Sequence, residues 1–239
     1  MEARPLIEVK NAKKTYRVGS VDVRALRGID LTIRAGEVVC IIGRSGSGKS
    51  TLLNVLAGLE HATSGEIIIL GKHLERMSQS DLIVFRQKHV GFIFQSFNLM
   101  PYYTAVENVA LPLTFRGVPA HKRRVLAASM LEAVGLETHR HHRPSEMSGG
   151  QQQRVGIARA LVMNPDIVFA DEPTGNLDSN TSDEVMRLIT GIVRRKKKTL
   201  IMVTHDPHIA EYADTVISIN DGRITETRHN ETYIGGDSI

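Results

Sequence analysis

The chain has 239 residues, 41% of them hydrophobic and 23% charged, which is ordinary for a globular protein with a sizeable core. Lys and Arg outnumber Asp and Glu by 30 to 26, and this net charge of +4 permits an anionic partner without requiring one. No apolar run approaches the ~18 residues of a membrane-spanning helix, and residues 1–5 do not resemble a signal peptide. The single cysteine, Cys40, cannot form an internal disulfide, so we expect a soluble, cytoplasmic chain.

The first third of the chain predicts a small antiparallel sheet. Residues 6–10 alternate between apolar and polar, and residues 23–33 contain two short β-prone runs broken at Gly28. Tyr16 lies between these regions in polar surroundings. An exposed aromatic ring ahead of a nucleotide site can stack on adenine, and a strand tyrosine can equally pack on its neighbours. The residues alone leave both interpretations open.

Residues 43–50 read Gly-Arg-Ser-Gly-Ser-Gly-Lys-Ser, which is the phosphate-binding pattern G-x-x-x-x-G-K-S. An apolar, strand-like run precedes the pattern and a helix-like run follows it, so free backbone N–H groups and the positive end of a helix dipole meet at one point. Lys49 supplies a charge for the β- and γ-phosphate oxygens, and Ser50 offers a hydroxyl to Mg²⁺. A glycine-rich surface loop is a much weaker interpretation in this context. The candidate nucleotide ligands here are Gly43, Ser45, Gly46, Ser47, Gly48, Lys49, Ser50 and Thr51.

A strand over 64–70, a short helix over 80–88 and a buried strand over 90–94 are predicted next. The last of these strands delivers Gln95 at its C-terminal end, the edge of an α/β sheet at which ligands bind. The Gln95 carbonyl oxygen is therefore a candidate contact for Mg²⁺ or for an attacking water, although a polar residue also simply ends strands.

Residues 96–145 predict a mostly helical insert, with helices from Thr104 to Leu113 and over 123–134. The stretch 96–103 is rich in aromatic and apolar groups, so it is either a core crossing or an exposed docking surface. His139, His141 and His142 follow in one cluster. Interleaved arginines and the lack of nearby cysteine or carboxylate ligands favour a solvated loop over a metal site.

Ser148 is a candidate N-cap for a helix that runs through Leu161, and the two glycines after it leave the helix start open to an anion. This second phosphate-type site has no lysine of its own. One γ-phosphate rarely needs two such sites unless they come from different subunits. The residues of this stretch are Ser148, Gly149, Gly150 and Gln151.

Two further apolar strands end in polar groups. The strand over 167–172 ends in Asp171, placed for Mg²⁺, and Glu172, placed to accept a proton from the attacking water. The strand over 199–204 presents His205, placed to bond the γ-phosphate. Between them a helix follows Asp178 and ends in basic residues that complement its dipole. Residues 216–224 predict a hairpin at Asn-Asp-Gly, and 226–239 a polar tail.

The candidate residues of the nucleotide site, taken in chain order from Tyr16 to His205, resemble the motifs of the ATP-binding cassette ATPases along essentially the whole chain. The resemblance implies an α/β fold: a P-loop NTPase core with a parallel sheet flanked by helices, an antiparallel β subdomain and a helical subdomain. The resemblance also implies one domain, 1–239, that divides into a core of 1–95 and 146–225, a helical part of 96–145 and the tail.

The resemblance further implies a role for each candidate residue. Tyr16 would stack on adenine, Gln95 and His205 would lie near the γ-phosphate, and residues 148–151 would form the signature. Glu172 would be the catalytic carboxylate and Asp178 the aspartate of the D-loop, and Mg²⁺ would be held by Ser50, Gln95 and Asp171. Met147 stands where the family usually has Leu, a small change in volume.

Residues 53–59, 92–101, 104–113 and 170–179 resemble more closely the subfamily for lipoprotein release, macrolide export and antimicrobial-peptide resistance. The resemblance implies ATP and Mg²⁺ as cofactors, a head-to-tail dimer with a second copy of the chain, and a permease that docks near Phe97–Arg116. It further implies a periplasmic adaptor reached through the permease, no nucleic-acid partner, and a location on the cytoplasmic face of the inner membrane. A cell-division regulator with a non-transporting membrane partner stays open, as does, more remotely, a soluble cassette ATPase.

Overall fold

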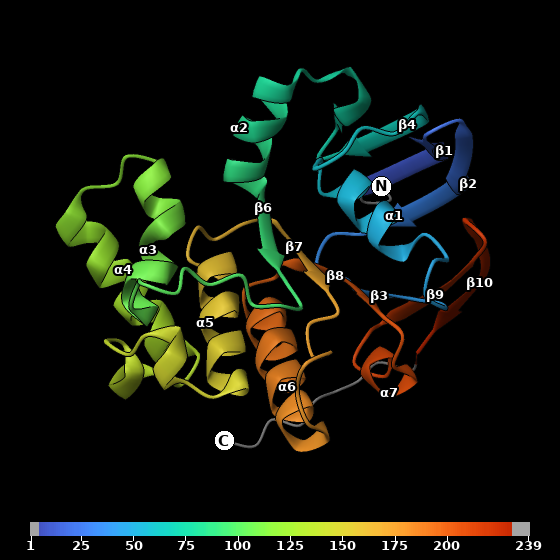
Figure 1. The fold of residues 1–239 in the computed structure, drawn as a ribbon. Coiled ribbons are helices and arrows are strands. Elements are labelled where there is room, and N and C mark those ends of the chain that lie inside the picture. The colour runs from blue at the N-terminus through green and yellow to red at the C-terminus, as the bar shows by residue number, and fades with distance from the viewer. Residues whose placement is uncertain (1–4, 231–239) are drawn as a thin grey trace.

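The computed structural model describes residues 5–230, which form two sheets and the helices that cover them (Figure 1). The smaller sheet is antiparallel, with strand order β2-β1-β4-β5. Its strands are β1 (Ile7–Val18), β2 (Val21–Ile33), β4 (Ser64–Ile69) and β5 (Lys72–His73). The prediction of a break at Gly28 between two short strands is wrong, because residues 23–33 belong to the single strand β2. Gly28, at φ 98, lets β2 continue through a conformation that residues with a Cβ rarely adopt.

The larger sheet carries the polar strand ends, and its strand order is β10-β9-β3-β8-β7-β6. All neighbours from β9 to β6 pair in parallel, whereas β9 and β10 form an antiparallel hairpin. The strands are β3 (Val38–Ile42), β6 (Val90–Ile93), β7 (Ile167–Asp171), β8 (Thr199–Thr204), β9 (Thr215–Asn220) and β10 (Arg223–His229). Part of the predicted polar tail therefore lies in a strand, because pairing with β9 orders β10 as far as His229; residues 231–239 lie outside the described residues.

The parallel strands alternate between two hydrophobic cores because successive strand residues point to opposite faces. Val38 and Cys40 of β3 pack into one core, and Val39 and Ile41 pack into the other. The first core is closed by helices α5 (Gly149–Leu161) and α6 (Ser179–Arg195), and the second by α1 (Lys49–Leu56) and the antiparallel sheet. The predicted α/β architecture is confirmed. Because β3 packs into both cores, the loop that follows β3 is anchored on both sides of the sheet.

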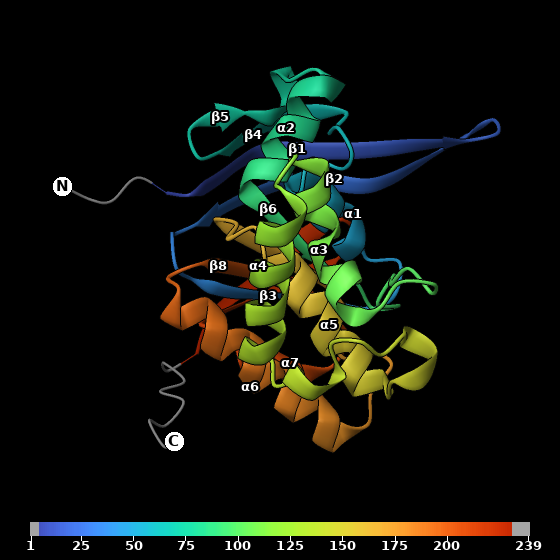
Figure 2. The same cartoon turned by 90° about the vertical axis from the view of Figure 1, so that its left-hand side faces the viewer.

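The helical part projects from one side of this core. It consists of α3 (Ala105–Phe115), α4 (Ala120–Ala133) and the 3₁₀ turns Glu137–His139 and Pro144–Glu146, and Figure 2 shows α4 and α3 from their outer side. Thr104 and Glu107 form a capping box that starts α3. The other described helices are α2 (Gln79–His89), α7 (Pro207–Ala210) and the 3₁₀ turn Leu74–Arg76. Among residues 5–230, the helices are all too short or too polar to cross a membrane.

Candidate active site

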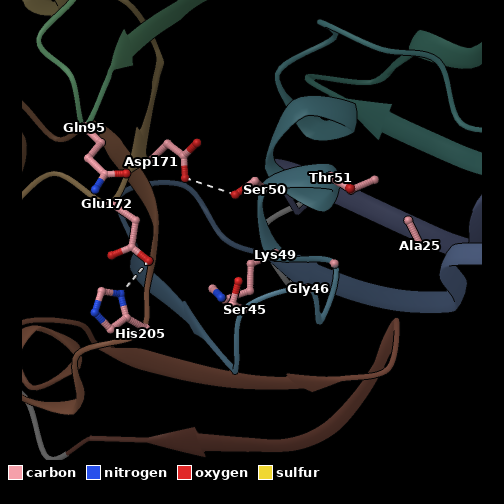
Figure 3. A pocket seen from close by; sticks show the side chains of 11 residues that line it. Ala25, Ser45, Gly46, Lys49, Ser50, Thr51, Gln95, Asp171, Glu172 and His205 are labelled. Atoms are coloured by element: carbon pink, nitrogen blue, oxygen red, sulfur yellow. Dashed lines mark hydrogen bonds and ion pairs between the residues drawn. The ribbon is translucent and has the colours of Figure 1, made fainter. Parts of the chain in front are cut away.

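A cavity of about 580 Å³ lies at the C-terminal edge of the parallel sheet. Figure 3 shows its two sides: the loop between β3 and α1 faces the ends of β6, β7 and β8. Since parallel strands bring their carboxyl ends to one edge, residues far apart in the sequence meet here. The lining residues are Ala25, Ser45, Gly46, Gly48, Lys49, Ser50, Thr51, Gln95, Asp171, Glu172 and His205.

The loop over 43–50 needs glycine where it passes under β2. A Cβ at Gly48 would lie 2.5 Å from the carbonyl oxygen of Ala25, and Gly48 has a φ of 103. Ser47 is a buried residue of this loop. Its backbone N–H donates to the oxygen of Arg44, and its hydroxyl has no hydrogen-bond partner among residues 5–230. Glycine at position 48 therefore lets the loop pass close to Ala25 of β2.

Lys49 is the positive charge of the cavity and is only 7% exposed. Its ammonium Nζ donates to the carbonyl oxygens of Gly43 and Arg44, at 2.9 Å and 3.0 Å. The same residue begins α1, which has no side-chain cap and no acidic residue in its first turn. An anion placed in the cavity therefore meets the ammonium, the free N–H groups of α1 and the positive end of its dipole.

Ser50 and Asp171 connect the two sides of the cavity. The Ser50 hydroxyl donates to Asp171 Oδ1 at 3.2 Å, and burial raises the pKa of the Asp171 carboxyl, with a smaller contribution from neighbouring Glu172. Gln95 lines the same cavity. A hydroxyl, a carboxylate and an amide oxygen form a hard-oxygen donor set that fits Mg²⁺.

Glu172 is held at both of its carboxylate oxygens. Oε1 lies 3.0 Å from His205 Nδ1, and Oε2 accepts from the Thr204 hydroxyl at 3.1 Å. The Thr204 oxygen also accepts from the N–H of Asp206, so its one hydrogen is directed at Glu172. The backbone of Glu172 has a φ of 45, which is uncommon for a residue with a Cβ and concentrates at functional sites. The carboxylate is thus oriented by two neighbours at the end of β8.

Sequence reasoning missed two members of this region. Ala25 enters the cavity wall from β2, and no pattern in the sequence marks it. Thr204 bonds Glu172, and its position at the end of a strand just before His205 is a signal that would have found it.

Several predicted residues lie outside the cavity wall. Tyr16 donates its hydroxyl to Glu60 at 2.7 Å, and Lys14 Nζ lies 5.0 Å from the centre of its ring. Burial raises the pKa of Tyr16, and the bond to Glu60 adds to the rise. Asp178 caps α6 and accepts from the N–H and the hydroxyl of Thr181 at 3.0 Å and 2.7 Å. Gly43 and Ser47 belong to the phosphate loop over 43–50, but neither lines the cavity.

The second phosphate-type site is also apart from the cavity, because none of residues 148–151 lines it. Ser148 caps α5 as predicted from its position: its hydroxyl accepts from the N–H of Gln151 at 3.3 Å, and Gln151 Oε1 accepts from the N–H of Ser148 at 2.9 Å. A Cβ at Gly150 would lie 2.6 Å from Thr181 Cγ2, so α5 and the start of α6 are in close contact. Met147 is buried among apolar residues, as the family's Leu would be.

The histidine cluster lies next to this capping box. His139 and His142 meet edge to face with ring centres 5.0 Å apart, and His139 Nε2 lies 3.1 Å from Gln151 Nε2. His141 is exposed. Residues 5–230 contain no group of three or more His, Cys, Asp or Glu side chains that could hold a metal ion.

Comparison with known proteins gives one consistent family. A model of the family described as ABC transporter matches residues 26–175. Relatives include a macrolide export ATP-binding/permease protein, MacB, from Chlorobaculum tepidum, 47% identical over 95% of this chain but only 34% of the relative's length. They also include a lipoprotein-releasing system ATP-binding protein, LolD, from Chromohalobacter salexigens, 42% identical over 92% of this chain and 93% of the relative.

Solved structures agree with the sequence relatives. A dimeric structure of MJ0796, described as a bacterial ABC transporter cassette, has a TM-score of 0.87 and is 41% identical, covering 95% of this chain and all of that one. A second dimeric structure, of a post-hydrolysis state bound to ADP and Pi, also has a TM-score of 0.87. The fold, the matched residues and the relatives together show that this chain belongs to the ABC transporter family, as an ATP-binding cassette ATPase domain.

Proposed function

We propose that this chain hydrolyses ATP as one of two copies in a membrane complex, and that the hydrolysis moves a permease. The observation that carries the proposal is the separation of two phosphate-type sites in one chain. The cavity has a lysine, a Mg²⁺-type donor set and a fixed carboxylate, whereas the capped N-terminus of α5 lies outside it. A second copy packed head to tail would bring its α5 to the open side of the cavity.

The residues of the cavity divide the work on ATP. The N–H groups of the loop and Lys49 bind the phosphates, with the ammonium exchanging its bonds to Gly43 and Arg44 for phosphate oxygens. Ser50, Gln95 and Asp171 would hold a magnesium ion, which supplies positive charge to the β- and γ-phosphate oxygens when bound. Tyr16 would reach the adenine after rotation away from Glu60.

Glu172 is the residue that acts on the attacking water. Its carboxylate accepts a proton as the water oxygen bonds the γ-phosphorus, and the bond from phosphorus to the β–γ bridging oxygen breaks with its electron pair leaving on ADP. Thr204 and His205 hold the carboxylate toward the cavity. His205 also lines the cavity, so it is placed to exchange this bond for the γ-phosphate.

The dimer is supported by the solved MJ0796 cassettes, both of which are dimeric. In the proposed dimer, Ser148 and Gly150 of one copy close on the γ-phosphate held by the other copy, beside Asp178. The test mixes Ser148→Arg chains with Glu172→Gln chains in the presence of ATP. With a different tag on each variant, we expect the mixed dimer to be recovered less than the Glu172→Gln homodimer, because one of its two sites faces the Ser148→Arg signature; a mixed dimer recovered as fully as that homodimer would contradict a signature acting from the second copy.

The permease would dock on the outer face of residues 97–116. Tyr102 and Phe115 are 84% and 74% exposed there, although they are large and apolar. The fully buried Asn108 fixes this surface, because its side chain bonds Met100 at both the N–H and the carbonyl oxygen and also bonds the carbonyl of Tyr103. An apolar surface held in one conformation favours a partner helix over solvent.

The surface next to these aromatics is basic. A cavity of about 820 Å³ between α3 and α4 includes Arg123, Arg124 and Arg140 in its wall and one carboxylate, Glu107. A permease segment with apolar and acidic residues fits this surface. The pairing is tested by co-purification of membrane proteins from a detergent extract, and Tyr102→Ala with Phe115→Ala should recover less permease than the wild type. The matched control is Val84→Ala, an apolar residue on α2 that is also exposed.

The named relatives favour export or mechanical work on a lipoprotein, macrolide or peptide-type substrate, with a periplasmic adaptor joined through the permease and the chain on the cytoplasmic face of the membrane. A pull-down from a detergent extract distinguishes the alternatives. A permease with a large extracytoplasmic domain supports the proposal. A membrane partner that transports nothing would favour a cell-division regulator, and ribosomes or DNA would overturn a membrane role.

A further inference from the structure

We infer that His139 is a positioning residue for the N-terminus of α5, and that it serves only as a neutral imidazole with its hydrogen on Nδ1. The inference rests on the proposed function in one respect: that N-terminus is taken to contact ATP on the second copy. The hydrogen-bond chain itself lies within one copy and is independent of that function.

This series of hydrogen bonds determines which atom of each pair is the donor. The backbone N–H of Ser148 can only donate, and it lies 2.9 Å from Gln151 Oε1, so the Gln151 amide is oriented with its oxygen toward Ser148. The amide NH₂ then faces His139 Nε2 at 3.1 Å. An NH₂ group can only donate, and therefore Nε2 of His139 must accept and carry no hydrogen.

The other ring nitrogen completes the assignment. A neutral imidazole without a hydrogen on Nε2 carries it on Nδ1, and Nδ1 of His139 lies 3.0 Å from the Thr138 hydroxyl oxygen, which accepts it. The ring is half-buried, with His142 against its edge. Two contacts and one neighbouring ring thus hold a single tautomer.

A second proton on His139 conflicts with this arrangement. The imidazolium has N–H groups on both nitrogens, so two donors would face each other between His139 and Gln151. Either the ring swings away, or the Gln151 amide reverses and abandons the N–H of Ser148. In both cases the capping box at the start of α5 loses a support, and the helix N-terminus is less well fixed.

Charged groups lie on the elements around this ring. His142 and the residues flanking His139 belong to the same loop. Arg154, on the next turn of α5, bonds the carbonyl of Val134 at the end of α4 and pairs with Glu184. The groups on these packed elements are Glu137, Arg140, His142, Arg154 and Glu184. The variants below leave all of them unchanged.

The first test needs no nucleotide. Nitrogen-15 NMR of the histidine rings in the full chain at about pH 8 reports the tautomer of each neutral imidazole. The signal that disappears in His139→Gln is that of His139, and we expect it to have the hydrogen on Nδ1. In Gln151→Ala, we expect the preference of His139 for the tautomer with hydrogen on Nδ1 to weaken toward the mixture of tautomers found in an exposed ring such as His141. A hydrogen on Nε2, or a tautomer indifferent to Gln151→Ala, would overturn the inference.

The second test is ATP turnover at one pH, compared between chains with and without a hydrogen-bond acceptor at this position. His139→Gln keeps an acceptor for the Gln151 amide, whereas His139→Arg presents only donors. The exposed His141→Gln is the matched control.

At about pH 8 we expect His139→Gln and His141→Gln to keep turnover near that of the wild type and His139→Arg to lose about 3- to 10-fold, the range for one lost hydrogen bond. Equal turnover in His139→Gln and His139→Arg would overturn a role of His139 in turnover. Failure of the proposed dimer is detected separately, by the Ser148→Arg mixture described above.

Discussion

The cavity and the N-terminus of α5 are both built to receive an anion, and they solve the problem differently. At the cavity, the loop before α1 has no side-chain cap, and a lysine supplies a full charge. At α5, a complete capping box occupies two of the backbone N–H groups, and no lysine is present. We therefore expect the cavity to bind phosphate without help from α5, and α5 to contribute partial charges that matter only against a phosphate held elsewhere.

This difference explains why one chain can contain both phosphate-type sites and still not form a complete ATP site by itself. The proposed catalytic carboxylate and the Mg²⁺-type donors belong to the cavity, so their loss should stop chemistry in every copy. Gly149 and Gly150 at α5 instead lie close to Phe97, Leu177 and Thr181, which links that N-terminus to the loop after Gln95 and to the start of α6. Changes there should act through packing and position.

The largest effect should come from Glu172→Gln. The amide keeps the shape, accepts from Thr204 and can donate to His205 Nδ1, but it cannot accept a proton, so ATP turnover should fall by about 10²- to 10⁴-fold while ATP binding persists. Steady-state phosphate release measures the loss. Glu211→Gln, an exposed carboxylate change, is the control, and near-normal turnover in Glu172→Gln would remove this residue from the reaction.

Lys49→Met tests the claim that the cavity binds phosphate by itself. Losing hydrogen bonds from a charged donor costs about 1.5–3 kcal/mol, so affinity for ATP should fall by about 10- to 100-fold. Titration calorimetry on the separate chain measures it, with exposed Lys72→Met as the control. Unchanged affinity would mean that Lys49 serves only to bind the carbonyls of Gly43 and Arg44.

The sequence was informative wherever a strand end or a helix start carried the function. Asp171 and His205 come directly after apolar runs, and Lys49 follows another apolar run across the glycine-rich loop. Because parallel strands share one edge, their convergence could be predicted. Ser148 was likewise predicted as an N-cap, because serine is a preferred residue at the start of a helix.

What the sequence could not supply depended on contacts between distant elements. Ala25 reaches the cavity only because β2 crosses the phosphate loop, and Tyr16 faces Glu60 because β1 runs beside residues 60–63. The bond from Gln151 to His139 joins two segments whose patterns are unremarkable separately. Pairing and packing of this kind leave no local periodicity to read.

Gly150→Ala tests the packing side of the comparison. The added methyl would lie 2.6 Å from Thr181 Cγ2, so α5 or α6 must shift, at a cost of about 1–3 kcal/mol in the free energy of unfolding. Urea unfolding measures the cost. Thr181→Ser removes the obstructing methyl and keeps the hydroxyl that bonds Asp178, so adding it to Gly150→Ala should restore most of the stability. No rescue would place the strain somewhere other than this contact.

Asp171→Asn should give the smallest effect, and in the opposite direction. Burial raises the pKa of this carboxyl in the folded chain, so the folded state disfavours the charged form. The resulting cost is fully present above the folded pKa and disappears as the pH falls below the value of an unfolded aspartate. The asparagine removes that charge and still accepts from Ser50, so the nucleotide-free variant should unfold at higher urea than the wild type at about pH 7, with a smaller gain at about pH 4.5. A variant less stable than the wild type at neutral pH would mean that the bond between Ser50 and a charged Asp171 outweighs the cost of burying it, and that the two sides of the cavity attract each other even without ATP.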